Sequence, residues 1–231
     1  MVHRAARDGY SGKQRFQCSS LYERKARLQG FEVIAGLDES GRGCLFGDVY
    51  AAAVILPFPP PIRGLNDSKQ LTPEQRETFA IRIRERAVAY SVATATAEEI
   101  DRINIYQASR LAMKRALEAL CVTPAYLLID ALKLDTLIPQ LPLIHGDELS
   151  ISIAAASIMA KTERDRAMLE WDCKFPAYGL ARHKGYSTPE HLRALAEHGP
   201  TPYHRMTYEP VQRYSPVPIT TEVVFVQEEL W

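Results

Sequence analysis

The chain has 231 residues, of which 46% are hydrophobic and 24% charged, and its 28 basic side chains balance 28 acidic ones at pH 7. This length allows one large or two small domains with a substantial core, and the composition is that of an ordinary globular protein. No apolar run approaches the roughly 20 residues that a membrane-spanning helix needs, and no apolar secretory signal opens the chain. We therefore expect a cytoplasmic protein without a membrane partner.

The cysteines and the charged residues indicate which ligands and partners the sequence favours. The four cysteines lack CxxC spacing and are too few for a disulfide scaffold, which argues against structural zinc. A net charge of zero gives no general attraction to nucleic acid, but the first 30 residues hold seven basic and two acidic side chains. We interpret residues 1–30 as a basic, partly flexible N-terminal extension.

The first predicted strand covers the apolar run 33–37 and ends in two adjacent acids, Asp38 and Glu39. Neighbouring carboxylates repel each other, so they lie either exposed or around a divalent cation. The residues that follow at 41–43, Gly-Arg-Gly, allow a close backbone approach to a ligand and offer a guanidinium group to phosphate. Taken alone, these residues leave open both an exposed loop and a cation-phosphate site.

The next elements follow familiar signals. A strand at 49–56 follows a tight turn, which predicts a hairpin with the first strand. Thr72 is placed to cap a helix that begins at the next residue, a proline. A third strand is expected over 88–96, followed by a long helical pattern over 97–120 that breaks near Asn104.

Two more apolar runs, 125–130 and 142–147, also end in acids, Asp130 and Asp147. The longest helical pattern, 149–173, begins with small residues that permit close packing on a sheet. Alternating helices and strands indicate an α/β fold, in which ligand sites gather at strand ends. We expect these acids and the first pair to meet at one edge.

Convergence of the four carboxylates would imply a metal, because four acids without a cation raise one another's pKa. Oxygen ligands select hard ions such as Mg²⁺ or Mn²⁺, and two such ions suit in-line attack on a phosphodiester. The alternative is that the acids belong to separate loops near helix starts. The residues alone do not decide between these two interpretations.

Several basic and aromatic residues have two interpretations as well. Lys184 and Tyr186 form either a basic surface whose aromatic ring stacks on a sugar or base, or a solvated loop. Lys69 and Lys161 either meet phosphate or are solvated. Four histidines lie within 183–204, but their spacing matches no zinc site.

An ordered set of motifs resembles bacterial type 2 ribonuclease H. The motifs are Asp38–Gly43, Asp67–Lys69, Leu128–Asp130, Gly146–Asp147, Ala154–Lys161, His183–Tyr186, His204–Arg205 and Glu209–Val211. Each motif alone is weak, but their order over roughly residues 31–212 is highly specific.

The resemblance implies an α/β, ribonuclease H-like fold, with a mixed five-stranded sheet flanked by helices and a small helical C-terminal part. The catalytic domain would span 31–212 and an extended tail 213–231. The expected activity is endonucleolytic cleavage of RNA in RNA/DNA hybrids and at single ribonucleotides in duplex DNA, leaving 3′-hydroxyl and 5′-phosphate ends. A junction resolvase and a non-catalytic hybrid-binding protein are the alternatives.

The resemblance also implies roles for individual residues. Two Mg²⁺ or Mn²⁺ ions would be held by Asp38, Glu39, Asp130 and Asp147. The substrate would contact Gly41, Arg42, Gly43, Lys69, Ser157, Lys161, Lys184 and Tyr186. Within this set, the Gly-Arg-Gly loop would read the ribose 2′-OH and Tyr186 would abut the sugar at the ribo-to-deoxyribo junction.

Three features depart from the family pattern or lie outside it. Ser40 stands where alanine is usual, and Glu148 where lysine or glutamine is frequent. The chain ends in Gln227–Trp231, which is similar to the peptides by which bacterial DNA-processing proteins dock on the sliding clamp. An incidental amphipathic tail is the alternative. We expect a monomer.

Overall fold

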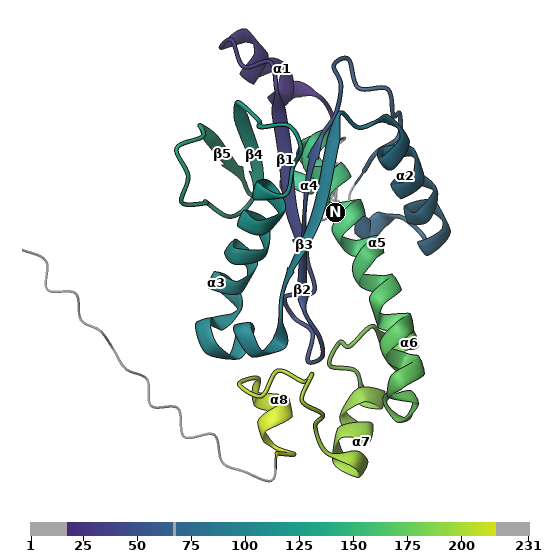
Figure 1. The fold of residues 1–231 in the computed structure, drawn as a ribbon. Coiled ribbons are helices and arrows are strands. Elements are labelled where there is room, and N and C mark those ends of the chain that lie inside the picture. The colour runs from purple at the N-terminus through teal and green to yellow at the C-terminus, as the bar shows by residue number, and fades with distance from the viewer. Residues whose placement is uncertain (1–17, 67, 216–231) are drawn as a thin grey trace, which may run out of the picture.

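The structure is a computed structural model that describes residues 18–66 and 68–215 (Figure 1). Its centre is one sheet of five strands in the order β3-β2-β1-β4-β5. The strands are β1 (Ile34–Ser40), β2 (Val49–Ile55), β3 (Ala89–Ala95), β4 (Tyr126–Asp130) and β5 (Gln140–Leu143). β1 pairs antiparallel with β2 and parallel with β4, so the sheet is mixed, as predicted.

The first acid pair lies inside a strand and not after its end, which corrects the sequence-based expectation. β1 continues to Ser40, with Asp38 opposite Ala52 and Glu39 opposite Ala51 of β2. The ladder continues because it joins backbone groups, and the small alanine side chains leave room beside the acids. Asp38 and Glu39 are therefore held by paired backbone and not by a free loop.

Helices cover both faces of the sheet (Figure 1). Helix α3 (Ala97–Glu118) packs on one face through Ala108, Ala112 and Ala116, whereas α2 (Pro73–Arg86) and α5 (Ile151–Lys174) cover the other. Apolar residues of β1 and β2 face α3, and Ala52 and Val54 face α5. This arrangement gives the sheet a buried core on each side. Within the described residues, no helix combines the length and apolar character needed to cross a bilayer.

The predicted helix signals are confirmed where the structure describes them. Thr72 forms a capping box with Gln75 at the start of α2. Asn104 has a non-helical backbone with φ 65°, and its side chain accepts a hydrogen bond of 3.1 Å from the Gln107 backbone N–H. The side chain of Asn104 therefore caps the second half of α3 where the first half ends.

The long helix expected from residue 149 begins two residues later, after a separate short helix, α4 (Gly146–Leu149). Ser150 stands between them in an extended conformation and caps α5. Close packing of α5 on β1 depends on Gly36, because a Cβ there would lie 2.1 Å from the Ser152 carbonyl carbon. The small residues predicted to allow this approach are buried in α5.

Helix α1 (Leu21–Leu28) belongs to the predicted basic extension and is tied to α5. Buried Glu23 accepts hydrogen bonds from Ser150 Oγ at 2.6 Å and from the Ser152 backbone N–H at 3.0 Å. A carboxylate at a helix N-terminus satisfies free N–H groups and complements the helix dipole. Residues 1–17 of the extension lie outside the described residues.

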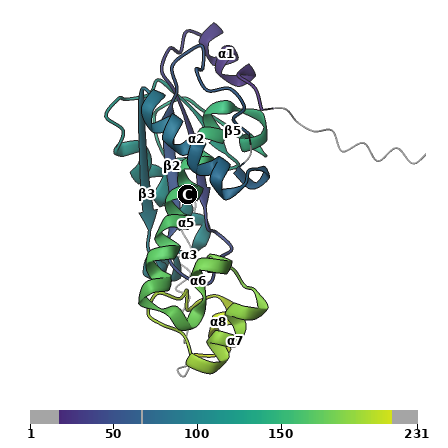
Figure 2. The ribbon, with the colours of Figure 1, turned by 90° about the vertical axis from the view of Figure 1, so that its right-hand side faces the viewer.

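The small helical C-terminal part lies beyond one end of the sheet (Figures 1 and 2). It contains α6 (Leu180–His183), α7 (Pro189–His198) and α8 (Glu209–Gln212), after a turn of 3₁₀ helix at Pro176–Tyr178. Another 3₁₀ turn, Ser68–Gln70, precedes α2. Of the predicted tail, only 213–215 are described, so Gln227–Trp231 lies outside the structure.

Candidate active site

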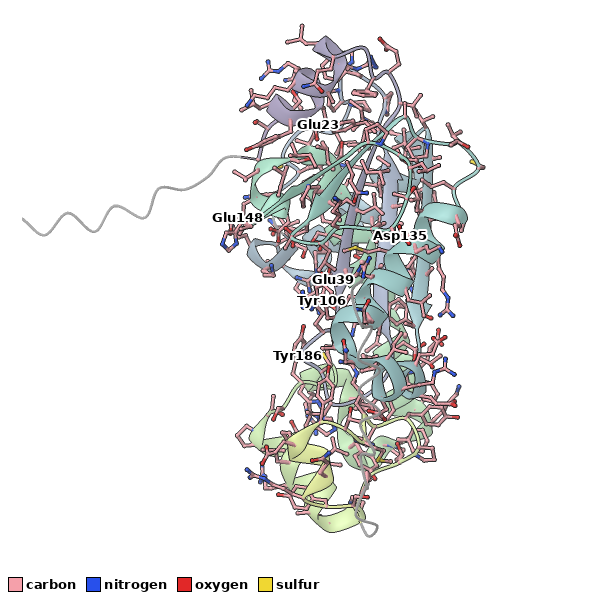
Figure 3. The ribbon with its side chains drawn as sticks, turned by 90° about the vertical axis from the view of Figure 1, so that its left-hand side faces the viewer. Glu23, Glu39, Tyr106, Asp135, Glu148 and Tyr186 are labelled. Carbon is pink, nitrogen blue, oxygen red and sulfur yellow. The ribbon has the colours of Figure 1, made fainter. Side chains whose placement is uncertain are left out.

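One pocket of about 240 Å³ brings together ten of the twelve residues predicted for the site. They are Asp38, Glu39, Gly41, Arg42, Gly43, Lys69, Asp130, Ser157, Lys161 and Tyr186, joined by Ser40 and Ser68. The acids come from β1 and β4, Ser157 and Lys161 from α5, and Tyr186 from the C-terminal part. Figure 3 shows Glu39 beside the sheet and Tyr186 where the C-terminal helices begin.

The two acids of β1 are buried close to a third. Burial raises the pKa of Asp38 well above its usual range, and the charges of Glu39 and Asp130 raise it further. Burial raises the pKa of Glu39 to about 7, although Arg42, whose Nη1 lies 3.3 Å from Glu39 Oε1, opposes the rise. Burial is the largest cause at both acids, and repulsion between the carboxylates adds to it.

Asp130 and Asp147 are held differently. Asp130 ends β4, as predicted, and its Oδ1 accepts a 2.7 Å hydrogen bond from the Gly146 backbone N–H. Asp147 does not end a strand: β5 ends at Leu143, the backbone turns at His145 with φ 57°, and Asp147 lies in the first turn of α4. The strand expected from Pro142 onward instead spans Gln140–Leu143, because its parallel pairing with β4 ends where Leu143 pairs with Asp130.

Asp147 does not line the pocket but acts on it. Its side chain is buried and forms a 2.9 Å ion pair through Oδ2 with Lys69 Nζ. Its charge still raises the pKa of both Asp38 and Asp130. Asp38 is therefore within electrostatic reach of the other three predicted acids.

The donor set fits a hard divalent cation by its chemistry. Every candidate ligand is a carboxylate oxygen, and Glu39 Oε2 is buried without a hydrogen-bond partner among the described residues. Over residues 18–66 and 68–215, no three His, Cys, Asp or Glu side chains are already arranged as ligands of one ion. The carboxylates instead accept hydrogen bonds from backbone N–H groups and from Lys69 and Arg42.

The predicted substrate residues cluster around the acids. Ser157 Oγ lies 2.9 Å from Ser68 Oγ, and Lys161 Nζ lies 5.8 Å from the centre of the Tyr186 ring. The Tyr186 side chain is partly open to solvent, with 40% of the residue exposed. Lys184 is not in this pocket; it lines a neighbouring groove of about 530 Å³ that shares Lys161.

The loop after Gly-Arg-Gly is built into the C-terminal part, which the sequence did not reveal. The Leu45 backbone N–H donates to the Gly185 carbonyl at 2.8 Å, and the Gly47 N–H donates to the Tyr203 carbonyl at 2.9 Å. Single β-bridges pair Cys44 with Tyr186 and Phe46 with His204. Residues 44–47 thus connect the catalytic sheet to the segment that carries Tyr186.

Three buried histidines lie beneath Tyr186. His191 Nδ1 lies 3.0 Å from the Tyr186 carbonyl oxygen, and His191 Nε2 lies 3.1 Å from His204 Nε2. The His183 ring stacks on His191 with centroids 4.5 Å apart. Burial lowers the pKa of His191 to about 4 and that of His204 to about 3, so both rings are neutral at pH 7.

Comparison with known proteins identifies the family. The family model described as ribonuclease HII matches residues 35–211. The chain belongs to the ribonuclease HII family. Ribonuclease HII of Solibacter usitatus is 58% identical over 89% of this chain and 90% of its own length, and that of Koribacter versatilis is 53% identical over 86% and 78%.

Solved structures agree with this assignment. The crystal structure of ribonuclease H2 from Pyrococcus horikoshii superposes with a TM-score of 0.69 at 26% identity, covering 79% of this chain and 96% of that one. The predicted ribonuclease H-like fold is therefore confirmed. Membership in the ribonuclease HII family makes this chain a ribonuclease H, an endonuclease that acts on RNA in RNA/DNA hybrids.

Proposed function

We propose that this ribonuclease HII also cuts at single ribonucleotides embedded in duplex DNA, by a mechanism that uses two divalent ions. The observation that carries the proposal is the single pocket in which three of the four acids meet Gly41–Gly43 and Tyr186. Groups suited to cutting and groups suited to recognising a ribose therefore face one space.

Asp38, Glu39, Asp130 and Asp147 are the proposed ligands of two Mg²⁺ or Mn²⁺ ions. When bound, such ions supply an activated water and neutralise charge at both ends of an in-line phosphodiester displacement. Asp38 is central, because its pKa responds to the charges of all three other acids. Attack of water on phosphorus that breaks the bond between phosphorus and the 3′ oxygen leaves a 3′-hydroxyl and a 5′-phosphate.

Positive side chains around the acids are the proposed phosphate contacts. Lys69 is already oriented by Asp147, and Lys161 lies between the pocket and the basic groove that contains Lys184. Ser157 offers a hydroxyl beside Asp38 and Ser68. Ammonium and hydroxyl donors at these positions suit a phosphodiester backbone that runs from pocket to groove.

Ribose selection is assigned to Gly41, Arg42, Gly43 and Tyr186. Gly41 has φ 99°, a conformation that favours glycine, and the open space beside Gly43 leaves its backbone accessible. Gly41, Arg42, Gly43 and Tyr186 line the same pocket, so one sugar is the proposed contact of both elements. Recognition of the 2′-OH separates RNA from DNA.

The test is cleavage of a duplex that contains one ribonucleotide, with an all-DNA duplex of the same sequence beside it. We expect Mg²⁺- or Mn²⁺-dependent cutting of the first duplex only, and loss of cutting in Asp38→Asn. Asp135→Asn, at an exposed position outside the pocket, is the matched control and retains activity. Equal cutting of both duplexes, or full activity of Asp38→Asn, contradicts the proposal. Cutting of a four-way DNA junction would favour a resolvase.

A further inference from the structure

Two arginine side chains lie behind the Gly-Arg-Gly loop and have no part in the chemistry proposed above. Arg164 belongs to α5 and Arg205 to the segment before α8. Both residues are 0% exposed, and neither pairs with a carboxylate among the described residues. They are the two largest fully buried side chains among the residues that the structure describes.

Arg205 fixes the middle of the loop. Its Nη1 donates a 2.7 Å hydrogen bond to the carbonyl oxygen of Arg42, and its Nε donates to the Gly47 carbonyl at 3.0 Å. The Tyr208 hydroxyl donates to the same Arg42 carbonyl at 2.7 Å and receives a 3.1 Å hydrogen bond from Arg205 Nη1. Two donors therefore hold one carbonyl group in the loop that faces the pocket.

Arg164 connects the same loop to the segment of Tyr186. Its Nη2 donates to the Lys184 carbonyl at 2.7 Å, and its guanidinium carbon lies 5.5 Å from the centre of the Tyr186 ring. On its other side it contacts Gly41 so closely that a Cβ there would lie 2.2 Å from Arg164 Nε. One side chain therefore touches both elements assigned to ribose recognition.

Stability alone does not account for these two residues. Burying a guanidinium group without a carboxylate partner is costly, and Arg164 Nε and Nη1 and Arg205 Nη2 lack hydrogen-bond partners among the described residues. An apolar side chain of similar length would fill the space without that cost. What arginine provides at Arg205 is a rigid fork that binds the carbonyl groups of Arg42 and Gly47 at once, and at Arg164 a planar group that binds the Lys184 carbonyl while packing on Gly41 and Tyr186.

We propose that Arg205 and Arg164 are positioning residues that fix the Gly-Arg-Gly loop relative to Tyr186 and thereby set selectivity for the ribose. This inference rests on the proposed function, in which both elements contact one sugar. The two arginines act through backbone carbonyls and packing, and do not touch the substrate. A misplacement of about 1 Å between such elements is enough to lower a rate about 100-fold.

The experiment compares Arg205→Met with wild type and with Arg115→Met. Arg115 is the control for loss of an arginine–carbonyl hydrogen bond, because it donates to the Thr94 carbonyl at 2.8 Å and lies outside the pocket, although it also pairs with Glu99. Two quantities are measured for each protein: kcat/KM on a duplex with one ribonucleotide, and Kd for the all-DNA duplex. We expect Arg205→Met to lower kcat/KM about 100-fold with Kd unchanged, and Arg115→Met to change neither.

A milder variant covers the case in which Arg205→Met does not fold. Tyr208→Phe removes only the hydroxyl that donates to the Arg42 carbonyl, and one hydrogen bond of about 1 kcal/mol corresponds to about a fivefold loss in kcat/KM. Arg164→Lys keeps the charge but not the fork, and we expect it to lower kcat/KM with Kd unchanged.

The outcomes separate this inference from the proposed function. If wild type does not require a ribonucleotide for cutting, the proposed function is wrong. If wild type requires it and the folded Arg205→Met and Tyr208→Phe proteins keep wild-type kcat/KM, only the positioning role is wrong. A loss of kcat/KM in Arg115→Met equal to that in Arg205→Met also overturns the positioning role, because it reflects general destabilisation.

Discussion

Lys69 Nζ lies 2.9 Å from Asp147 Oδ2, although the lysine side chain is 77% exposed and that of the aspartate only 3%. The exposed lysine therefore supplies positive charge to a buried acid. A divalent ion beside Asp147 would supply positive charge in place of Lys69 and would release the Lys69 ammonium group for a phosphate. Lysine and metal are thus expected to substitute for each other.

Replacing Lys69 by methionine tests this substitution. We expect Lys69→Met to lower the melting temperature in the presence of a chelator, because Asp147 then stays buried without its partner. The loss becomes smaller with Mg²⁺ or Mn²⁺, which differential scanning calorimetry measures. Lys133→Met, at an exposed position outside the pocket, is the control. A loss that is the same with and without metal would refute the relationship.

Asp38→Asn is expected to stabilise the metal-free protein while abolishing cleavage. The folded-state pKa of Asp38 is raised above the ordinary value of 3.8. The stability that Asp38 contributes to the fold is therefore fully present below pH 3.8 and is lost as the pH rises through the folded-state pKa. Asparagine removes the cost of burying a charged carboxylate at neutral pH. It also keeps an oxygen that accepts the 2.7 Å hydrogen bond from the Glu39 N–H.

Urea unfolding in a chelator, over a pH series, measures the effect. The stability gained by Asp38→Asn grows with pH, whereas the exposed Asp135→Asn substitution leaves the curve unchanged. If Asp38→Asn destabilises the protein at neutral pH, other groups already stabilise the buried negative charge of Asp38 and the prediction is wrong.

The buried histidines predict acid sensitivity. The pKa of His191 is lowered from 6.5 to about 4 and that of His204 to about 3, so the unfolded chain takes up protons first as pH falls. The stability that the two neutral histidines contribute to the fold is fully present above about pH 6.5 and is lost as the pH falls toward their folded-state pKa values. Each pKa unit corresponds to about 1.4 kcal/mol, so the loss is several kcal/mol in size.

Thermal unfolding between neutral pH and pH 4 checks this prediction. We expect His191→Gln to flatten the acid slope of the melting temperature. His198→Gln, on the same helix but outside the buried cluster, keeps the wild-type slope. Identical slopes in both variants would assign the acid sensitivity to other groups.

Gly36→Ala is expected to destabilise the fold by more than about 3 kcal/mol. The new Cβ would lie 2.1 Å from the backbone of Ser152, so α5 must move away from β1. Gly43→Ala is the control for stability, because a Cβ there meets no atom within 4 Å and its φ is not positive. Chemical denaturation of both variants gives the comparison, and a stable Gly36→Ala protein would contradict the packing described here.

The C-terminal peptide Gln227–Trp231 lies outside the described residues, and the prediction for it comes from the sequence alone. If it docks on the bacterial sliding clamp, deleting these five residues abolishes clamp binding in calorimetry and leaves kcat/KM on a short substrate unchanged. A scrambled tail of the same composition is the control. Equal clamp binding by full-length and truncated protein would show that the tail is incidental.

The sequence by itself determined the order of the strands and of the long helices, the caps at Thr72 and Asn104, the fold class and the family. These follow from local signals, namely apolar periodicity, capping side chains and motifs in a fixed order. It also supplied ten residues that meet in one pocket. It misplaced the end of β1 and the position of Asp147, because strand ends depend on the neighbouring strand and not on the residues themselves.

Only the tertiary structure decided what holds the site together. Arg164 and Arg205 are separated from Gly41 and Arg42 by more than a hundred residues, and nothing in the local sequence marks them as buried. Their role depends on which carbonyl groups lie within reach after α5 and the C-terminal part have packed against the loop. Such contacts are set by packing in three dimensions, so local sequence patterns do not show them, although Arg205 belongs to one of the motifs that carry the resemblance.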